Sequence, residues 1–217
     1  MTTIILTCTV NINPNINCIY QKNPEERIST YLKSILQWLT KTNFKIILVE
    51  NSGYNFDELN NEKELYKNRF EVITFKENSI EEASYLKNNF SKGNSEIFAI
   101  NYAFDNSKII NSSNFIIKIT GRYYIDEFEK YLNQFDLNNY DCLTQNNRDR
   151  CEIIGSHYNN FAFIFNTIFT CDENIYDDYI EQVWKLRTST YDNILICKEF
   201  KIDKTQRGGV NCCYDTI

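Results

Sequence analysis

The chain has 217 residues, of which 42% are hydrophobic, 15% aromatic and 24% charged, and its formal net charge is −6 at pH 7. This composition is typical of a folded globular protein with a substantial core. The negative charge argues against a protein built to neutralise a nucleic-acid backbone. No segment reaches the roughly 18 apolar residues of a membrane span. We therefore expect neither nucleic acid nor a membrane-spanning segment.

The first third of the chain predicts alternating strands and helices. Ile4–Val10 is an apolar run typical of a strand, and a polar loop at 11–23 follows it. Asn23-Pro24-Glu25-Glu26 begins a helix, with an Asn cap, proline at the first position and acids in the first turn. Phe44–Val49 and Phe70–Phe75 predict the second and third strands.

The middle of the chain continues the alternation. Ser79 and Glu82 have the spacing of a capping box, which predicts a helix of about ten residues. After the loop 91–94, Ser95 begins another helix, with apolar residues at helical spacing. Phe115–Ile119 then reads as a strand buried on both faces, ending in Thr120-Gly121-Arg122-Tyr123.

The last third predicts further helices and strands. Asp126–Phe135 and Ile175–Leu186 have helical spacing, and Tyr140–Thr144 and Phe161–Phe165 read as strands. This alternation favours an α/β fold with a mixed, mainly parallel central sheet flanked by helices. The closer spacing of the later strands predicts a smaller antiparallel section toward the C-terminus. Without a linker or repeat, we expect a single domain over 1–217.

Several familiar sites are missing from the sequence. It contains no P-loop, no G-x-G-x-x-G after the first strand and no G-x-S-x-G elbow. Eight scattered cysteines form no C-x-x-C pair, which argues against zinc and favours free thiols. The adjacent pair Cys212-Cys213 is the one candidate for exposed, reactive thiols. The single histidine, His157, is more typical of a structural residue than of a catalytic one.

Polar groups instead follow successive strands. The predicted strand ends carry Thr7-Cys8-Thr9, Glu50-Asn51-Ser52 and Thr120-Gly121-Arg122-Tyr123, and Lys92-Gly93 precedes a helix whose amides can face an anion. In a parallel sheet these ends share one edge, which is where α/β proteins bind ligands. Such an edge suits a nucleotide diphosphate. Arg122 can grip a phosphate through two parallel hydrogen bonds or form a structural ion pair at the strand end.

The ordered segments VENSG, KGNSE and KITGRY resemble the GT-A glycosyltransferases over roughly residues 3–165. They look most like small glycosyltransferase domains of large DNA viruses, including a chlorella-virus type, and of bacteria. The resemblance implies transfer of a sugar, of the hexosyl or deoxyhexosyl class, from a nucleotide-diphosphate sugar. A UDP-sugar is the favoured donor. The acceptor would be a hydroxyl on a glycan, on a protein-linked sugar or elsewhere.

The same resemblance implies different roles for the two parts of the chain. Residues 1–125 would bind the nucleotide and residues 126–217 the acceptor. Glu50, Asn51 and Ser52 would hold the base or ribose, while Lys92, Gly93 and Glu96 would cover the diphosphate side. A cytoplasmic location follows, in the host cytoplasm if the source is viral.

The chain departs from that family at one position. Where a metal-binding D-x-D motif is expected, it has Thr120-Gly121-Arg122. Either Arg122 neutralises the leaving diphosphate and the reaction is metal-independent, or Mn²⁺ or Mg²⁺ is held by carboxylates from elsewhere. Asp126 is a candidate ligand or a helix cap. The metal ligands remain unknown.

Candidates for the general base are the carboxylates of Asp149 and Glu181, with Glu96 and the imidazole of His157 as further possibilities. The arginines beside Asp149, Arg148 and Arg150, could help hold phosphate or could lie in a solvated loop. Two other functions stay open. One is a nucleotidyltransferase that makes a nucleotide-sugar. The other is a non-catalytic carbohydrate-binding protein on a degenerate transferase fold.

Overall fold

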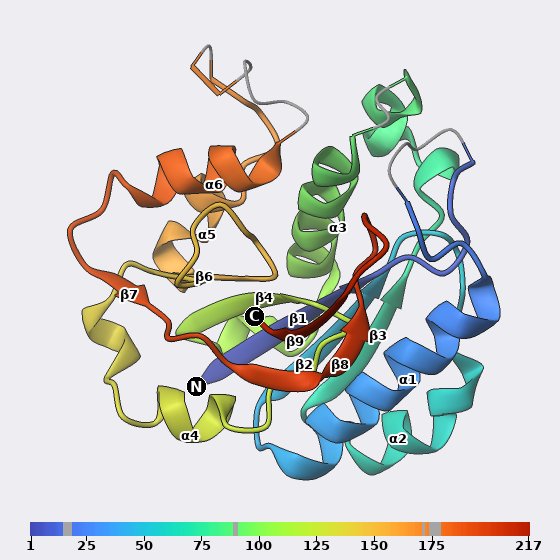
Figure 1. Cartoon of the computed structure of the whole chain (residues 1–217), viewed down its shortest axis with the longest axis horizontal. Coiled ribbons are helices and arrows are strands. Elements are labelled where there is room, and N and C mark those ends of the chain that lie inside the picture. Colours follow the sequence, from blue (N-terminus) through green and yellow to red (C-terminus); the bar gives the residue numbers. More distant parts are fainter. Residues whose placement is uncertain (15–18, 89–90, 171, 174–178) are drawn as a thin grey trace.

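The computed structural model describes residues 1–14, 19–88, 91–170, 172–173 and 179–217. In this part of the chain a seven-stranded sheet has the order β3-β2-β1-β4-β6-β5-β7, and β8 and β9 form a separate hairpin (Figure 1). The strands are β1 (Thr2–Cys8), β2 (Lys45–Glu50), β3 (Phe70–Thr74), β4 (Phe115–Thr120), β5 (Cys142–Thr144), β6 (Ile153–His157), β7 (Ile194–Ile196), β8 (Lys201–Gln206) and β9 (Cys213–Thr216).

Strand directions divide the sheet into two parts. β3, β2, β1 and β4 are mutually parallel, whereas β6 is antiparallel to both β4 and β5. The mainly parallel α/β fold with a smaller antiparallel section is thereby confirmed. Cys8 pairs with Glu50 and Thr7 with Thr120, so the three predicted strand ends share one edge. His157 pairs with Phe115 at the opposite edge.

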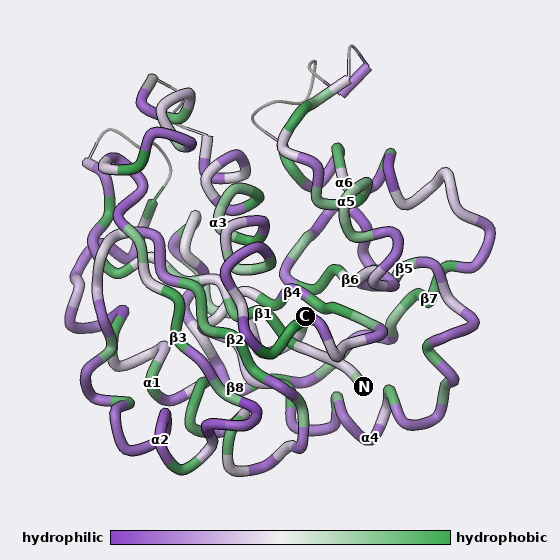
Figure 2. The backbone as a smooth tube through the Cα atoms, turned by 180° about the vertical axis from the view of Figure 1, so that it is seen from behind, coloured by the Kyte–Doolittle hydropathy of each residue, from purple (hydrophilic) through white to green (hydrophobic). Residues whose placement is uncertain are grey.

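Helices cover both faces of the sheet because its strands are apolar on both sides. They are α1 (Pro24–Lys41), α2 (Asn60–Leu65), α3 (Lys92–Asn106), α4 (Phe128–Leu132), α5 (Phe161–Ile164) and α6 (Ile180–Thr188). α1, α4 and the C-terminal residues pack on one face, and α3, α5 and α6 on the other. Hydrophobic residues concentrate in the strands, whereas α2 is largely hydrophilic (Figure 2). None of the described helices is long and apolar enough to cross a membrane.

Most elements of the parallel half form where the sequence predicts them. Asn23 caps α1 and accepts a hydrogen bond from the Glu25 amide at 2.8 Å. β1 ends at Cys8, two residues earlier than expected. α3 begins at Lys92 and not at Ser95, because Ser91 already acts as its cap.

Several elements differ from the sequence prediction. The predicted strand Phe161–Phe165 is wrong: this segment is α5, whose buried residues Phe161, Ile164 and Phe165 have helical spacing. The helix expected after Ser79 is the 3-10 helix Glu81–Asn88. The strands β6, β7, β8 and β9 and the helix α2 were not predicted as individual elements. Of the predicted helix 175–186, residues 175–178 lie outside the described residues.

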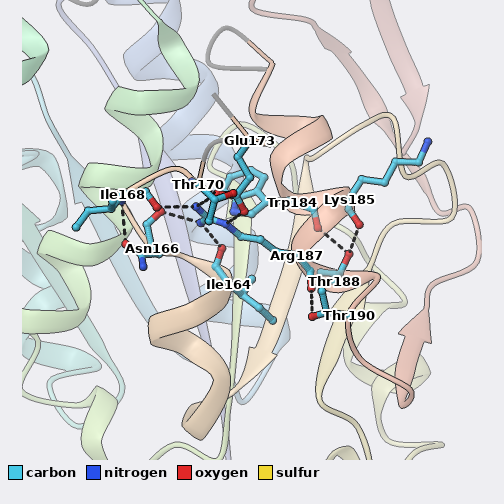
Figure 3. Close-up of polar contacts among 10 residues, drawn as sticks. All are labelled: Ile164, Asn166, Ile168, Thr170, Glu173, Trp184, Lys185, Arg187, Thr188 and Thr190. Carbon is cyan, nitrogen blue, oxygen red and sulfur yellow. Dashed lines mark hydrogen bonds and ion pairs between the residues drawn. The ribbon is translucent and has the colours of Figure 1, made fainter. Parts of the chain in front are cut away.

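Arg187 holds the segment after α5 against α6, and its guanidinium group is fully hydrogen-bonded (Figure 3). Arg187 is 3% exposed and donates to the carbonyl oxygens of Ile164, Asn166 and Ile168 at 3.0, 2.7 and 3.3 Å. It also donates to both carboxylate oxygens of Glu173, at 2.8 and 3.1 Å. Burial alone would raise the pKa of Glu173, but hydrogen bonds from Arg187 and the Thr170 amide leave it below its ordinary value of 4.5.

Candidate functional site

The ends of β1 and β4 meet tightly at the shared edge of the sheet. The Gly121 amide donates to the Thr7 carbonyl oxygen at 2.8 Å. A Cβ on Gly121 would lie 2.8 Å from that oxygen, closer than real Cβ atoms come. A glycine is therefore required for β4 to turn here, and the turn places Arg122 at the edge.

Glu50 organises the loops after β1 and β2. Its side chain is fully buried and accepts hydrogen bonds from the amides of Val10, Ser52 and Tyr54 at 2.8–2.9 Å, and from the Ser52 hydroxyl. This buried carboxylate is hydrogen-bonded from several sides, so it shapes the loops after β1 and β2 from within. Its predicted contact with base or ribose stays a prediction.

The groups beside Glu50 are more accessible. Asn51 and Ser52 are half-buried, and Thr9 donates through its hydroxyl to Asn51 Oδ1 at 2.6 Å. Burial, with help from Glu50, raises the pKa of Cys8 well above its ordinary value of 9.0. Cys8 is therefore a neutral thiol at pH 7 and contributes no charge to this edge of the sheet.

Three arginines gather where the hairpin approaches β4. Arg122 Nη1 donates to the Gln206 carbonyl oxygen at 3.3 Å. The guanidinium carbons of Arg150 and Arg207 lie 4.2 and 5.1 Å from the centre of the Tyr214 ring, at distances typical of cation–π contacts. We call Arg122, Arg150 and Arg207 the arginine cluster.

The arginine cluster has unused hydrogen-bonding capacity. Arg122 Nε and Arg150 Nη2 are buried and have no hydrogen-bond partner among the described residues. Within that same part of the chain Arg122 lies in no ion pair, whereas Arg150 Nε contacts Glu152 at 3.2 Å. The structure therefore gives no support to a structural ion pair for Arg122. A buried donor without a partner is costly, so each such group calls for an explanation.

A carboxylate lies on the α3 side of the same edge. Glu96, in the first turns of α3, accepts from Thr7 Oγ1 at 2.7 Å and from Lys118 Nζ at 2.9 Å through the same oxygen. Lys118 is fully buried in β4 and also donates to the Cys151 carbonyl and the Thr120 hydroxyl, at 2.6 and 3.2 Å. Burial alone would lower the pKa of Lys118, but attraction to Glu96 and the hydrogen bond raise it overall.

The start of α3 is packed against α6. A Cβ on Gly93 would lie 2.6 Å from Ile180 Cβ, so the glycine permits close contact of the two helices. Ser95 donates to Glu77 at 3.0 Å, and burial raises the pKa of Glu77 above its ordinary value of 4.5. Lys92 is exposed at the first position of the helix, and its contact with a diphosphate stays a prediction.

The predicted catalytic carboxylates differ in their surroundings. Asp149 is exposed and accepts from Lys185 at 2.6 Å and Gln182 at 3.2 Å; Lys185 lowers its pKa. Glu181 is half-buried in the first turn of α6 and lines a small hollow beside Cys151. It forms no ion pair within the described ranges.

Two further candidates lie away from the edge or serve other contacts. His157 is at the opposite edge, where its Nδ1 accepts from the Asn159 amide at 3.3 Å. Asp126 is exposed and accepts from the Tyr124 hydroxyl at 3.2 Å. Its interpretation as a helix cap is wrong, because α4 begins at Phe128 directly after Glu127.

The residues at the D-x-D position do not fit a divalent cation. Mn²⁺ and Mg²⁺ prefer carboxylate and other oxygen ligands, whereas Thr120-Gly121-Arg122 offers one hydroxyl and a cation. Among the residues that the structure places, no group of three or more histidine, cysteine, aspartate or glutamate side chains could hold a metal ion.

Sequence reasoning missed Lys118, Arg207 and Tyr214. Lys118 carries a signal, because it interrupts an otherwise apolar run. Arg207 stands before two glycines, which is typical of a turn, but its distance from β4 in the sequence hides the contact.

No protein-family model and no curated protein matches the chain. Among solved structures it is similar to a protein from Desulfovibrio desulfuricans G20 assigned as a nucleotide-diphospho-sugar transferase, with 15% identity, 90% of this chain and 79% of that chain covered, and a TM-score of 0.50. It is also similar to the glycosyltransferase GlyE of Streptococcus pneumoniae TIGR4, with 9% identity and a TM-score of 0.55. That match covers 90% of this chain and 45% of GlyE, so the chain spans less than half of its length. These likenesses establish a GT-A-like α/β fold.

Proposed function

We propose that this protein is a glycosyltransferase that binds a nucleotide-diphosphate sugar at the edge formed by β1, β2 and β4. The observation that carries the proposal is the pair of buried, unpartnered guanidinium nitrogens, Arg122 Nε and Arg150 Nη2. A guanidinium matches a phosphate in both charge and geometry. The edge is also where ligands of open α/β sheets bind.

The arrangement suggests a role for each side of the site. The arginine cluster would take up the negative charge that develops on the leaving diphosphate as the glycosidic bond breaks. Asn51 and Ser52 would contact the base or ribose, with a UDP-sugar as the favoured donor and a hexosyl or deoxyhexosyl group transferred. Glu181 is the best-placed candidate to accept the proton of the acceptor hydroxyl, because Asp149 is already held by Lys185.

The proposal is tested by thermal unfolding with UDP, UDP-sugars, GDP and GDP-sugars, each with and without Mn²⁺. A ligand that binds only the folded state stabilises it, by about 2.7 kcal/mol at a hundred times its Kd. We expect at least one nucleotide diphosphate to raise Tm, and Arg122→Ala to reduce that shift strongly. Lys204→Ala removes an exposed charge from β8 and is the matched control, with an unchanged shift. No shift with any of these ligands contradicts the proposal.

A further inference from the structure

We propose that the hollow beside the end of β5 is a carboxylate-binding site, and that the sugar acceptor of this enzyme is consequently an acidic sugar of the uronate class. The hollow is the one that Glu181 lines, and it is formed by residues of β5, β6, α6 and the turn between β5 and β6. This inference rests on the proposed function and adds the class of acceptor.

The hollow lies at the same edge of the sheet as the proposed donor site. β4 and β5 are both antiparallel to β6, so they run in the same direction and end at the same edge. Gln145 and Arg148 follow the end of β5, and Trp184 comes from α6. Arg150 lines the hollow as well and belongs to the arginine cluster. A group bound in the hollow would therefore lie beside the proposed diphosphate.

Polar groups without hydrogen-bond partners are concentrated around this hollow. Four of them are Gln145 Nε2, Arg148 Nε, Trp184 Nε1 and Thr144 Oγ1, which are buried and have no partner among the described residues. The Gln145, Trp184 and Thr144 residues are only 1%, 2% and 5% exposed. A buried polar group without a partner is costly, so a concentration of such groups indicates a missing ligand.

The number of donors and the size of the hollow both fit a carboxylate. A side-chain amide has two N–H hydrogens, and the Nε of arginine and the Nε1 of tryptophan have one each, so the three nitrogens offer about four. A carboxylate has about four acceptor positions, twice the number on a single hydroxyl-type oxygen. The inner hollow has a volume of about 10 Å³, and about 230 Å³ when space open to solvent is included. It therefore has room for about one oxygen atom inside, with the rest of the ligand at the mouth.

The charge of Arg148 is not balanced within the described part of the chain. Its Nη2 donates to the Lys185 carbonyl, to Thr188 Oγ1 and to Ser189 Oγ at 3.1, 2.7 and 3.0 Å. All three are neutral oxygens, and among the described residues Arg148 forms no ion pair. A guanidinium beside unpaired N–H groups favours a negatively charged ligand over a neutral one.

The other charged groups at the hollow leave this position to a ligand. Lys185 is paired with Asp149 at 2.6 Å, and Arg150 with Glu152 at 3.2 Å. Glu181 also lines the hollow, but its carboxylate forms no hydrogen bond or ion pair with any described residue. The unpaired groups are therefore not satisfied by a carboxylate of the described chain.

A uronate as sugar acceptor fits the hollow and its surroundings together. It carries a carboxylate at C6 and hydroxyl groups on the same ring. With the carboxylate held by Gln145, Arg148 and Trp184, the ring hydroxyls would lie at the mouth of the hollow, which Glu181 lines. Glu181 is the group proposed to accept the proton of the acceptor hydroxyl.

The two tryptophan indole signals give a direct test by nuclear magnetic resonance of the isotope-labelled chain. Trp184 lines the hollow, whereas Trp38 Nε1 donates to the Tyr123 carbonyl at 2.9 Å and is the internal reference. Methyl glucuronoside and acetate should each shift the Trp184 N–H signal saturably at pH 7 and constant ionic strength, and leave that of Trp38 in place. Methyl glucoside, which differs from the glucuronoside only at C6, should shift neither. No saturable shift with methyl glucuronoside, or an equal shift with methyl glucoside, overturns the inference.

Gln145→Glu changes the hollow with little change in shape. Its Oε1 can still accept from the Ile153 amide, as in the wild type at 3.4 Å, but the second oxygen adds a negative charge. We expect methyl glucuronoside to bind about tenfold or more weakly, because like charges then meet. Asn146→Asp makes the same chemical change at the next, exposed residue and is the matched control, with unchanged affinity. Equal losses in the two variants would reduce the effect to general charge and overturn the assignment.

Thr144→Val keeps the test valid if Gln145→Glu does not fold. It removes the unpaired hydroxyl and keeps the volume of the side chain. Methyl glucuronoside should bind about fivefold more weakly, within the range for one hydrogen bond, while Tm does not fall because the lost hydroxyl has no partner among the described residues. A lower Tm with unchanged affinity would show a structural hydroxyl and contradict the assignment.

Glu181→Gln distinguishes a ligand carboxylate from one of the chain. If the hollow serves a ligand, this variant should bind methyl glucuronoside at least as tightly as the wild type, since a like charge at the mouth is removed. Binding in the variant and none in the wild type would assign the hollow to Glu181 itself and overturn the inference. Calorimetry with UDP separates the two proposals: no UDP binding together with an intact Trp184 shift would overturn the proposed function and leave the carboxylate site.

Discussion

Arg187 and Arg122 show two different environments for an arginine in one molecule. Arg187 is surrounded by three carbonyl oxygens and the two oxygens of Glu173, and it links α6 to the segment after α5. Arg122 donates one hydrogen bond of 3.3 Å, to Gln206, and its buried Nε has no partner among the described residues.

The difference separates a structural arginine from the arginine that we propose binds the diphosphate. A guanidinium has five N–H donors, and Arg187 uses its donors inside the protein. Arg122 lies just after the end of β4, at the edge of the sheet that carries the ends of β1, β2 and β4, and its buried Nε is unused. Removing the first should cost stability, and removing the second should cost affinity.

The largest expected effect is on stability, from Arg187→Met. Removal of one partner from a buried ion pair leaves an uncompensated charge, at a cost of about 3–5 kcal/mol. Urea unfolding followed by circular dichroism measures this loss. The double variant Arg187→Met with Glu173→Leu should recover part of it, because no charge is then left buried. A single variant as stable as the wild type contradicts the structural role.

A smaller effect is the pH dependence of the stabilisation that Glu173 provides through its pair with Arg187. The pKa of Glu173 is lower in the folded protein than its ordinary value of 4.5, so the unfolded chain takes up this proton first. The stabilisation is therefore present above about pH 4.5 and is lost as the pH falls through the folded pKa. Urea unfolding between pH 7 and 3 should show the gap between wild type and Glu173→Gln closing on acidification. A gap that stays constant would exclude this linkage.

The smallest expected effect concerns the packing of Arg122 against the hairpin. A Cβ on Gly208 would lie 2.7 Å from Arg122 Nη2 and 2.8 Å from Nη1. Gly208→Ala should displace the flexible guanidinium and weaken UDP binding by about tenfold or less, or about 1 kcal/mol, within the range for one hydrogen bond. The neighbouring change Gly209→Ala on the same turn is the control. Equal UDP affinities in both variants would show that the position of the guanidinium does not matter.

The parallel half of the fold could be predicted because its signals are local. Asn23 and Pro24 mark a helix start, and Phe115–Ile119 is too apolar for a surface strand. Phe161–Phe165 was wrongly predicted as a strand, since a short apolar run fits a buried strand or a helix turn equally well. β6 was missed because Gly155, Ser156 and His157 weaken its strand pattern; the glycine is needed where Ile117 and Phe115 crowd it.

The candidate site was predicted in part for the same reason. Strand ends are local features, and the pairing of parallel strands brings Cys8, Glu50 and Thr120 to one edge. The contact of Arg122 with Gln206 spans 84 positions and depends on how the hairpin folds back. The partner of Lys118 likewise follows from tertiary packing. The ligand contacts of the predicted site residues remain predictions.

Calorimetric titration of UDP and uridine into the wild type and Arg122→Ala tests the central claim most directly, because the two ligands differ only by the diphosphate. We predict that Arg122→Ala weakens UDP binding by about 1.5–3 kcal/mol, the range for hydrogen bonds to charged groups, and leaves uridine affinity and Tm unchanged. UDP affinity equal in the two proteins would contradict the account and return Arg122 to a structural role.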